Sequence, residues 1–262
     1  MKRLITTIVL GAGFIPGNCG IALADDSVET CKRLAASPTE PGSGGVGVAS
    51  WLVKPAQAIP ACEAALKVEP DSAIIHYRLG RALDADKRYT EALEHYQIAA
   101  QKGFVEAAVN IAGNYRYRWD PPDFVQVAIW LKRAADGGHV GSQFALGDAY
   151  WKGEGVPQST SEALKWFRQA ADGKDSAALF MLGQFHDTGE GVTHDQKIAF
   201  DYYMRAARLN HPLAMYNVAS MYARGEGVAL DAKEAARWFA LAKTIGAVHG
   251  TARRARRERT RR

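Results

Sequence analysis

The sequence has 262 residues, of which 47% are hydrophobic and 23% charged, with 25 glycines, 10 prolines and three cysteines. This composition excludes a collagen-like chain, a mostly disordered chain and a small disulfide-dense domain. The net charge of +5 is concentrated at the two ends, because residues 1–24 hold two basic residues and no acid, and residues 251–262 hold seven arginines against Glu258. The body over residues 25–250 is therefore slightly acidic.

The first 24 residues have the pattern of an export signal. Lys2 and Arg3 precede an apolar run over residues 4–15, and residues 22–24 read Ala-Leu-Ala. This order is typical of a cleaved signal peptide, and the run is shorter than the ~20 residues of a membrane-spanning helix. We predict a mature chain that begins at Asp25, is periplasmic or secreted, and has no transmembrane span. The alternative is a buried N-terminal helix.

Cleavage leaves two cysteines, Cys31 and Cys62, around a stretch with weak helical signal, since residues 38–47 are rich in Pro and Gly. In an oxidising compartment such a pair favours a disulfide. Closing a loop of about 30 residues would stabilise the fold by roughly 3 kcal/mol. We expect a Cys31–Cys62 disulfide within an irregular N-terminal segment over residues 25–54. The alternative is two buried free thiols.

A 36-residue repeat dominates the rest of the chain. It begins at Phe104 and gives four units over residues 104–247. Such a period is typical of stacked supersecondary units. One aromatic and one alanine position recur in every unit, at Trp130, Trp166, Tyr202 and Trp238 and at Ala134, Ala170, Ala206 and Ala242.

Each unit predicts two helices joined by a turn. In the second unit, Gly153 is expected to end the first helix in a left-handed conformation. Ser159 is expected to cap the second helix through its side-chain oxygen. The same position holds a capping residue in the other three units, at Asp123, Asp195 and Asp231.

Residues 55–103 follow the 34-residue spacing of tetratricopeptide repeats, and an earlier, degenerate unit supplies a helix containing Ala58, Cys62 and Ala65. The 36-residue units resemble Sel-one-like repeats (SLR), relatives of tetratricopeptide repeats. The pattern L-G-x-x-Y-x-x-G-x-G-V followed by A-x-x-W-x-x-x-A-A is carried by Leu146, Gly147, Tyr150, Gly153, Gly155, Val156, Ala163, Trp166, Ala170 and Ala171. The resemblance implies an all-α fold, a right-handed α-solenoid of stacked helix–turn–helix repeats, and an adaptor or regulatory function.

Motifs for catalysis do not accompany the repeats. Gly42, Gly44 and Gly47 match a dinucleotide fingerprint as a string, but no strand precedes them. The sequence has no H-E-x-x-H, zinc-finger cysteine spacing or G-x-S-x-G. We expect no catalytic, cofactor-binding or metal site, and a non-enzymatic interaction scaffold or adaptor in the bacterial cell envelope. The alternatives are an envelope hydrolase, such as a β-lactam or cell-wall enzyme, and a periplasmic inhibitor of a membrane sensor.

The resemblance also implies a binding surface, because the first helix of each tetratricopeptide-like unit lines the concave face. In that register another protein or a peptide segment would contact Tyr77, Arg81, Tyr115, Arg116, Asp148, Trp151, Lys152, Gln184, Asp187, Ser220 and Arg224. Phe144, Phe180 and Tyr216 share this register. The alternative for these three aromatics is a place in the core.

The first 36-residue unit departs from the pattern, since Tyr-Arg-Trp-Asp-Pro-Pro over residues 117–122 replaces the glycine-rich turn. Tyr, Trp and Arg are enriched in binding hot spots. We predict that Trp119 belongs to a protruding contact patch. The alternative is that it packs into the adjacent helix pair.

The C-terminal segment over residues 248–262 is strongly basic, through Arg253, Arg254, Arg256, Arg257, Arg259, Arg261 and Arg262. An anionic envelope polymer, anionic lipid headgroups or an acidic partner fits this charge. No nucleic-acid partner is expected, because no aromatic residue is interleaved for base stacking. The alternative is a solvated tail with no specific target.

Overall fold

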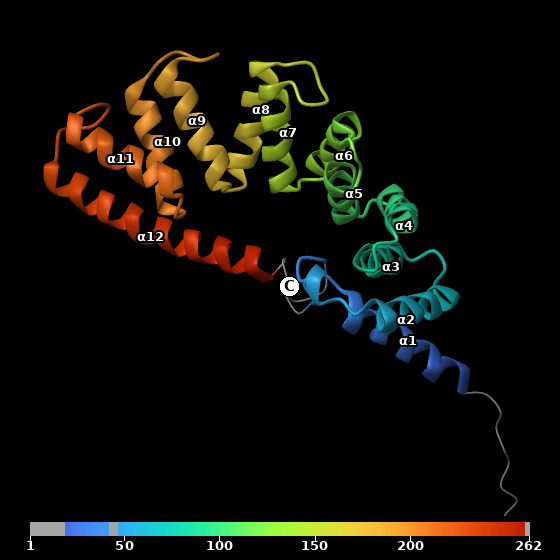
Figure 1. Ribbon diagram of the computed structural model, residues 1–262. Coiled ribbons are helices and arrows are strands. Elements are labelled where there is room, and N and C mark those ends of the chain that lie inside the picture. The colour runs from blue at the N-terminus through green and yellow to red at the C-terminus, as the bar shows by residue number, and fades with distance from the viewer. Residues whose placement is uncertain (1–18, 42–46, 260–262) are drawn as a thin grey trace, which may run out of the picture. The chain divides into compact units, whose positions relative to one another are not determined.

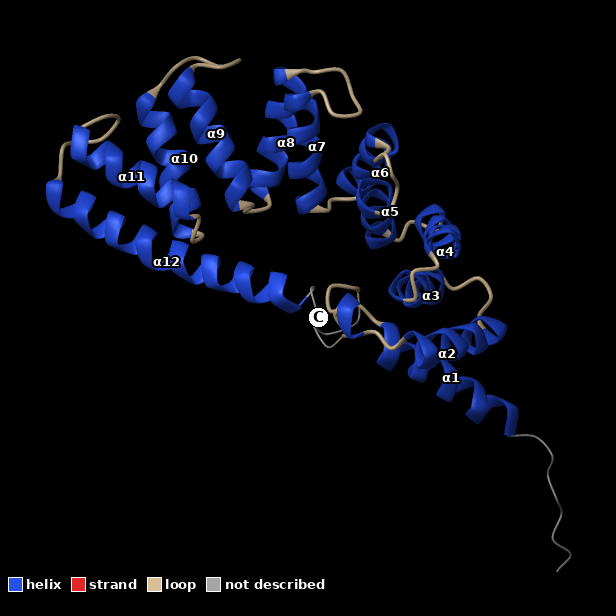
Figure 2. Ribbon diagram, in the orientation of Figure 1, coloured by secondary structure: helices blue, strands red, loops and turns tan. Residues whose placement is uncertain are grey.

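The computed structural model describes the backbone of residues 19–41 and 47–259, and the side chains of residues 26–41 and 47–246. This part of the chain is all-α, with twelve α-helices and one 3₁₀ turn and no strand (Figures 1 and 2). None of its helices is both long enough and apolar enough to cross a bilayer. Apart from the backbone of residues 19–24, the predicted leader lies outside the described residues.

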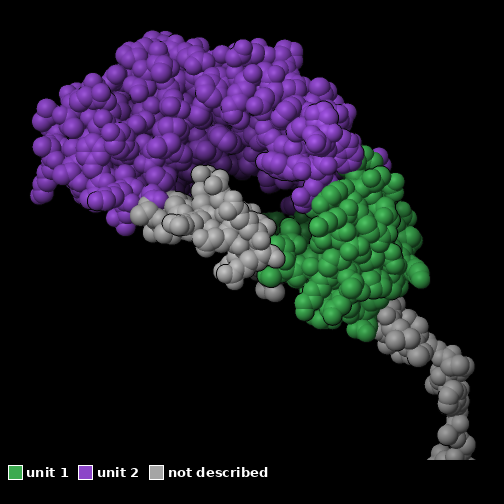
Figure 3. All heavy atoms as spheres, viewed as in Figure 1, with its two compact units in different colours: residues 1–99 green, residues 100–262 purple. Residues whose placement is uncertain are grey.

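The chain divides into two compact units, Met1–Ala99 and Ala100–Arg262 (Figure 3). The first unit opens with helix α1 (Cys19–Ala35) and helix α2 (Pro55–Val68), which pack against each other. The predicted disulfide is present between these two helices, and its cysteine Cα atoms lie 4.7 Å apart. The sequence predicted only one helix of the degenerate tetratricopeptide-like unit, which is α2. Helix α1 is the other helix of that pair.

The N-terminal segment predicted to be irregular over residues 25–54 differs from that expectation in its first third, which is helical. Helix α1 continues to Ala35 because the sequence has neither Gly nor Pro between Gly20 and Pro38. Cys31 and Ala35 lie one helical turn apart and are completely buried. A short 3₁₀ turn, η1 (Ser50–Leu52), precedes α2. The burial of one face of α1 against α2 and α3 therefore determines this helix.

Helices α3 (Ala73–Ala85) and α4 (Tyr89–Gln101) form the predicted tetratricopeptide-like pair. Ring contacts join the two helices, because Tyr77 lies 5.9 Å from Tyr96 between centroids. Helix α4 crosses the boundary between the compact units at Ala99.

The second unit contains four helix pairs at the predicted spacing, which confirms the solenoid of helix–turn–helix repeats. Successive helices pack on one another along the chain. The pairs are α5 (Val105–Tyr117) with α6 (Phe124–Asp136), α7 (Val140–Lys152) with α8 (Thr160–Asp172), α9 (Ser176–Thr188) with α10 (Gln196–Arg208), and α11 (Pro212–Arg224) with α12 (Ala232–Arg259).

The predicted caps of the second helices are all formed. Each side-chain oxygen accepts a backbone N–H from the first turn of its helix, as in the 3.0 Å bond from Gln126 N to Asp123 Oδ1. The other three caps are Ser159, Asp195 and Asp231. Gly153 ends α7 with φ 75°, the predicted left-handed conformation. Local capping chemistry therefore fixes where the repeat helices begin and end.

The glycine-rich turns of the second, third and fourth 36-residue units each pack onto the preceding unit. Gly155 has φ 73°, and a Cβ built there would lie 1.9 Å from the carbonyl oxygen of Phe124, at the start of α6. Gly227 makes the same close approach to Gln196 at the start of α10. The Gly-x-Gly-Val motif thus allows consecutive units to pack closely, because only glycine permits this backbone contact.

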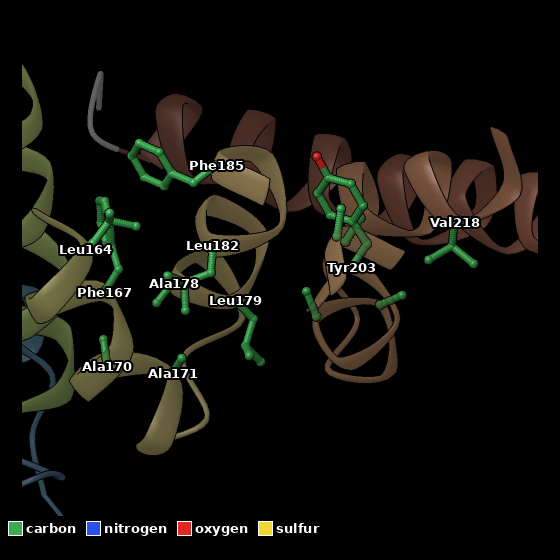
Figure 4. Close-up of a cluster of buried hydrophobic side chains, with 14 of the residues drawn as sticks. Leu164, Phe167, Ala170, Ala171, Ala178, Leu179, Leu182, Phe185, Tyr203 and Val218 are labelled. Carbon is green, nitrogen blue, oxygen red and sulfur yellow. The ribbon is translucent and has the colours of Figure 1, made fainter. Parts of the chain in front are cut away.

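The core of the second unit runs through consecutive pairs. Phe167, Leu182 and Phe185 form part of a continuous buried cluster that also includes Tyr203 and Val218 (Figure 4). Buried alanines, among them Ala163, Ala170, Ala178, Ala199 and Ala206, separate the large side chains. Small residues let the helices approach closely while the aromatic rings fill the space between pairs.

Candidate functional site

Two predicted binding residues on α3 are buried and do not form an accessible surface. Tyr77 and Arg81 are 3% and 5% exposed. The guanidinium of Arg81 donates to the carbonyl oxygens of Ala35 at 2.5 Å and of Val48 at 2.6 Å. Their assignment to a partner-binding surface is wrong, because the chain's own N-terminal segment covers this face of α3.

The same segment is held by a buried ion pair. Glu40 accepts hydrogen bonds from Arg78 Nε at 3.0 Å and Nη2 at 2.7 Å, and its second carboxylate oxygen accepts the backbone N–H of Ser37. Both charged side chains are almost completely buried. Mutual pairing compensates the loss of hydration.

The hollow nearest to the predicted surface lies between the ends of α7 and α9 in two consecutive units. It has a volume of about 150 Å³ and is lined by Trp151, Met181, Gln184, Phe185, Thr188 and Glu190. Two of these residues, Trp151 and Gln184, were predicted from the sequence. The structure therefore brings part of the predicted surface together as a pocket.

The orientation of Trp151 is fixed by two contacts across the unit boundary. Its Nε1–H donates to Glu190 Oε1 at 2.9 Å. Its ring meets that of Phe185 edge to face, with centroids 6.2 Å apart and planes at 81°. This arrangement is one of the preferred geometries for an aromatic pair. The pocket is therefore preformed in the protein without a partner.

Two other predicted residues, Asp148 and Lys152, pair with each other on α7. Lys152 Nζ lies 2.7 Å from Asp148 Oδ2, and the lysine side chain is exposed. The predicted Asp187 instead accepts from Gln196 Nε2 at 3.4 Å and from the Tyr203 hydroxyl at 3.3 Å. Burial raises the pKa of Tyr203 above its ordinary value, and the charge of Asp187 adds to this effect. Tyr203 is therefore a neutral donor at physiological pH.

The predicted residues of α11 lie one unit further along the chain. Arg224 is exposed and its Nε lies 2.9 Å from a carboxylate oxygen of Glu226. Ser220 is half-buried. Neither residue lines the pocket between α7 and α9.

The predicted residues of the first 36-residue unit form a separate cluster. Arg116 Nη2 donates to Glu154 Oε2 at 2.8 Å, and its guanidinium lies 5.7 Å from the ring centroid of Phe124. Trp119 rests on Tyr115, with ring centroids 5.0 Å apart, and remains 37% exposed. The indole thus packs on its own α5 helix and still presents a surface to solvent.

The three aromatic residues that share the first-helix register, Phe144, Phe180 and Tyr216, do not all belong to the core. Phe144 and Phe180 pack against core rings, at 5.5 Å from Phe167 and 5.7 Å from Tyr203 between centroids. Tyr216 is 55% exposed, with its ring 5.2 Å from that of Phe239. The core interpretation therefore holds for the two phenylalanines.

The first two turns of α6 expose apolar side chains at positions where the second helices of the other repeats expose polar ones. Val125 and Ile129 are 56% and 52% exposed. The same two repeat positions in α8, α10 and α12 hold exposed polar or charged residues, namely Ser161 and Lys165, Lys197 and Asp201, and Lys233 and Arg237. Helix α6 therefore presents a surface that repeat packing does not require.

Sequence reasoning missed four pocket residues, Met181, Phe185, Thr188 and Glu190. Glu190 belongs to the recurring Gly-Glu-Gly-Val turn, 39 residues after its partner Trp151. The equivalent Glu154 is bound by Arg116 from 38 residues earlier. A search for side chains about one repeat before each turn glutamate would have found the contact.

The described side chains contain no group of three or more metal-ligating residues. The predicted arginines of the C-terminal segment lie outside the described side chains. The backbone there continues α12 to Arg259.

Comparison with known proteins agrees with this architecture. The Sel1 repeat model matches residues 105–139, 140–175, 176–211 and 212–246, and a tetratricopeptide repeat model matches residues 54–104. The Sel1 matches cover more than half of the chain, so the protein belongs to the Sel1 repeat family. The sequence matches no curated protein.

Two solved structures share this fold. A Sel1 repeat protein from Oxalobacter formigenes is 26% identical, with a TM-score of 0.67, over 71% of this chain and 79% of that chain. A protective antigen of uropathogenic Escherichia coli with an SLR fold is 30% identical, with a TM-score of 0.66, over 72% of this chain. The match spans only 41% of the length of that antigen.

Proposed function

We propose that this protein is an exported, non-enzymatic scaffold of the bacterial cell envelope that binds a protein partner along the first helices of its Sel1 repeats. The repeat family supports a protein-interaction scaffold. The signal-peptide pattern over residues 1–24 and the disulfide between α1 and α2 support an oxidising compartment outside the cytoplasm.

The observation that carries the binding surface is the pocket between α7 and α9. It combines apolar walls from Trp151, Met181 and Phe185 with polar groups at Gln184 and Glu190. A concave apolar site with a few oriented polar groups is the usual form of a binding pocket. Trp is also among the residues that contribute most to interface energies.

Crosslinked capture from the native periplasm tests this proposal with two matched variants. Gln184→Arg places a bulky cation at the pocket, whereas Gln169→Arg makes the same change at an exposed position of α8. We expect the wild type and Gln169→Arg to capture the same protein and Gln184→Arg to lose it while circular dichroism stays helical. Equal capture by all three folded proteins would place the binding surface elsewhere.

The arginine-rich C-terminal segment is proposed as an electrostatic aid to association with an anionic polymer or an acidic partner. Exposed charge mainly accelerates encounter and is screened over ~8 Å at physiological salt. Deleting residues 251–262 should slow association and weaken its salt dependence while a specific complex persists.

A further inference from the structure

The pocket between α7 and α9 contains one carboxylate, Glu190, that forms no ion pair with the described residues. Glu190 is exposed, and its partner among these residues is the neutral indole N–H of Trp151. The other pocket residues, Met181, Gln184, Phe185 and Thr188, carry no charge. The pocket therefore has apolar walls and a single negative group.

Comparison of repeat units shows that this pairing is unusual within the chain. The same turn position holds Glu154 and Glu226, and each of them forms an ion pair with an arginine: Glu154 with Arg116 at 2.8 Å and Glu226 with Arg224 at 2.9 Å. The repeat position of these arginines holds Lys152 and Thr188 in the units beside Glu190. Lys152 pairs with Asp148 at 2.7 Å, and Glu190 accepts the indole N–H of Trp151 instead. Among the described residues, the ion pair that Glu154 and Glu226 form is thus not formed at Glu190, where a pocket opens instead.

The geometry points to a basic side chain as the missing group: we propose that the pocket binds a Lys or Arg side chain presented by a segment of the partner protein. This inference rests on the proposed function, because it names the chemistry of the partner at the same surface. The carboxylate of Glu190 would pair with the cationic head of the partner residue.

The indole of Trp151 strengthens the case for a cation. Trp is the best side-chain partner for a cation over a ring face. Its hydrogen bond to Glu190 is donated by Nε1–H at the ring edge and does not itself occupy a ring face. One residue therefore positions the carboxylate and also supplies a second attraction for the same charge.

The size and walls of the pocket suit the rest of such a side chain. A cavity of ~150 Å³ accommodates a benzene-sized group, and this pocket has about that volume. The stems of Lys and Arg are apolar methylenes that pack on hydrophobic surface while the charged head stays at the rim. Met181 adds a side chain that adapts to an irregular shape.

Titration of the full-length protein with single-residue probes tests the inference directly. The probes are N-acetyl-arginine amide, its neutral isostere N-acetyl-citrulline amide, and N-acetyl-norleucine amide. The readout is the indole N–H signal of Trp151 in a ¹H–¹⁵N NMR spectrum, identified with Trp151→Phe among the six tryptophans. We expect the arginine probe to shift this signal saturably and to bind at least about tenfold more tightly than either neutral probe.

A matched pair of variants separates the pocket charge from general electrostatics. Glu190→Gln keeps an oxygen that can accept the Trp151 indole N–H but removes the charge, and it should abolish the preference for arginine. Glu226→Gln removes the same charge one unit away and should leave the preference unchanged. Because the two variants change the net charge equally, a nonspecific effect would appear in both.

Three results would overturn the inference: norleucine binding as tightly as arginine, no saturable shift with any probe, or equal loss of the preference in both glutamate variants. Each would leave the capture experiment on Gln184→Arg unaffected. A partner that still depends on the pocket would then show that the scaffold proposal is right and that the anchor is not basic.

Discussion

Replacement of Gly147 by alanine tests whether ring packing between the helices of a pair limits the size of the first-helix side chain. Gly147 lies within α7, and a Cβ built there would be 2.8 Å from two ring carbons of Phe167. Phe167 is completely buried and cannot turn toward solvent. Overpacking of this kind costs about 1–3 kcal/mol.

Gly113 is the matched control, because it lies in the interior of α5 and a Cβ built there meets nothing within 4 Å. Alanine is favoured over glycine in a helix by about 1 kcal/mol. Gly113→Ala should therefore stabilise the protein by about that amount. Gly147→Ala gains the same helix propensity but meets the Phe167 ring, so it should be about 1–3 kcal/mol less stable than Gly113→Ala.

Urea denaturation followed by far-UV circular dichroism measures both changes, and a second substitution tests the cause. The first unit has Ile111 and Leu131 at the two positions that Gly147 and Phe167 occupy in the second. Phe167→Leu should therefore be less costly in the Gly147→Ala background than alone, with a coupling of about 0.5–3 kcal/mol. Equal stabilisation by Gly113→Ala and Gly147→Ala, or a coupling of zero, would refute this reasoning.

Three further predictions follow from burial and covalent structure. Trp166→Ala should lower the free energy of unfolding by about 3–5 kcal/mol, and Trp238→Ala by less, because Trp166 is buried and Trp238 only partly so; equal urea midpoints would contradict this. Intact mass spectrometry after alkylation should show Cys31 and Cys62 unmodified until reduction, and a mature chain starting at Asp25. Burial lowers the pKa of His95, and the neighbouring imidazole of His76 lowers it further. Below about pH 6.5 the unfolded chain therefore binds more protons than the folded chain, and the free energy of unfolding should fall as the pH falls. His95→Gln should flatten the urea midpoint between about pH 7 and pH 5, and an unchanged slope would show that another group is responsible.

The sequence by itself determined the repeat architecture of this protein. A 36-residue period, four capping residues and the glycine of the turn at Gly153 give the unit boundaries, since each acts through neighbours in the same helix or turn. Buried alanines and one aromatic position per unit likewise identified the packing face. These features are local or strictly periodic, and a single chain shows them several times.

Only the tertiary structure decided which predicted surface residues are accessible. Tyr77 and Arg81 occupy the register of a binding face, but Glu40 and the carbonyl groups of the N-terminal segment cover that face. The covering segment lies 33 to 46 residues away in the sequence and follows no repeat. Nothing in the periodicity of α3 carries information about it.

For the same reason, only two of the six residues that line the pocket between α7 and α9 were predicted from the sequence. Trp151 lies at a repeat position that could be extrapolated, whereas its partner Glu190 and the neighbouring Phe185 come from the next unit. The contact depends on how far one helix pair is offset from the next, and side-chain packing at the unit boundary sets that offset. The sequence gives the members of each unit, and the stacking of the units decides which of them meet.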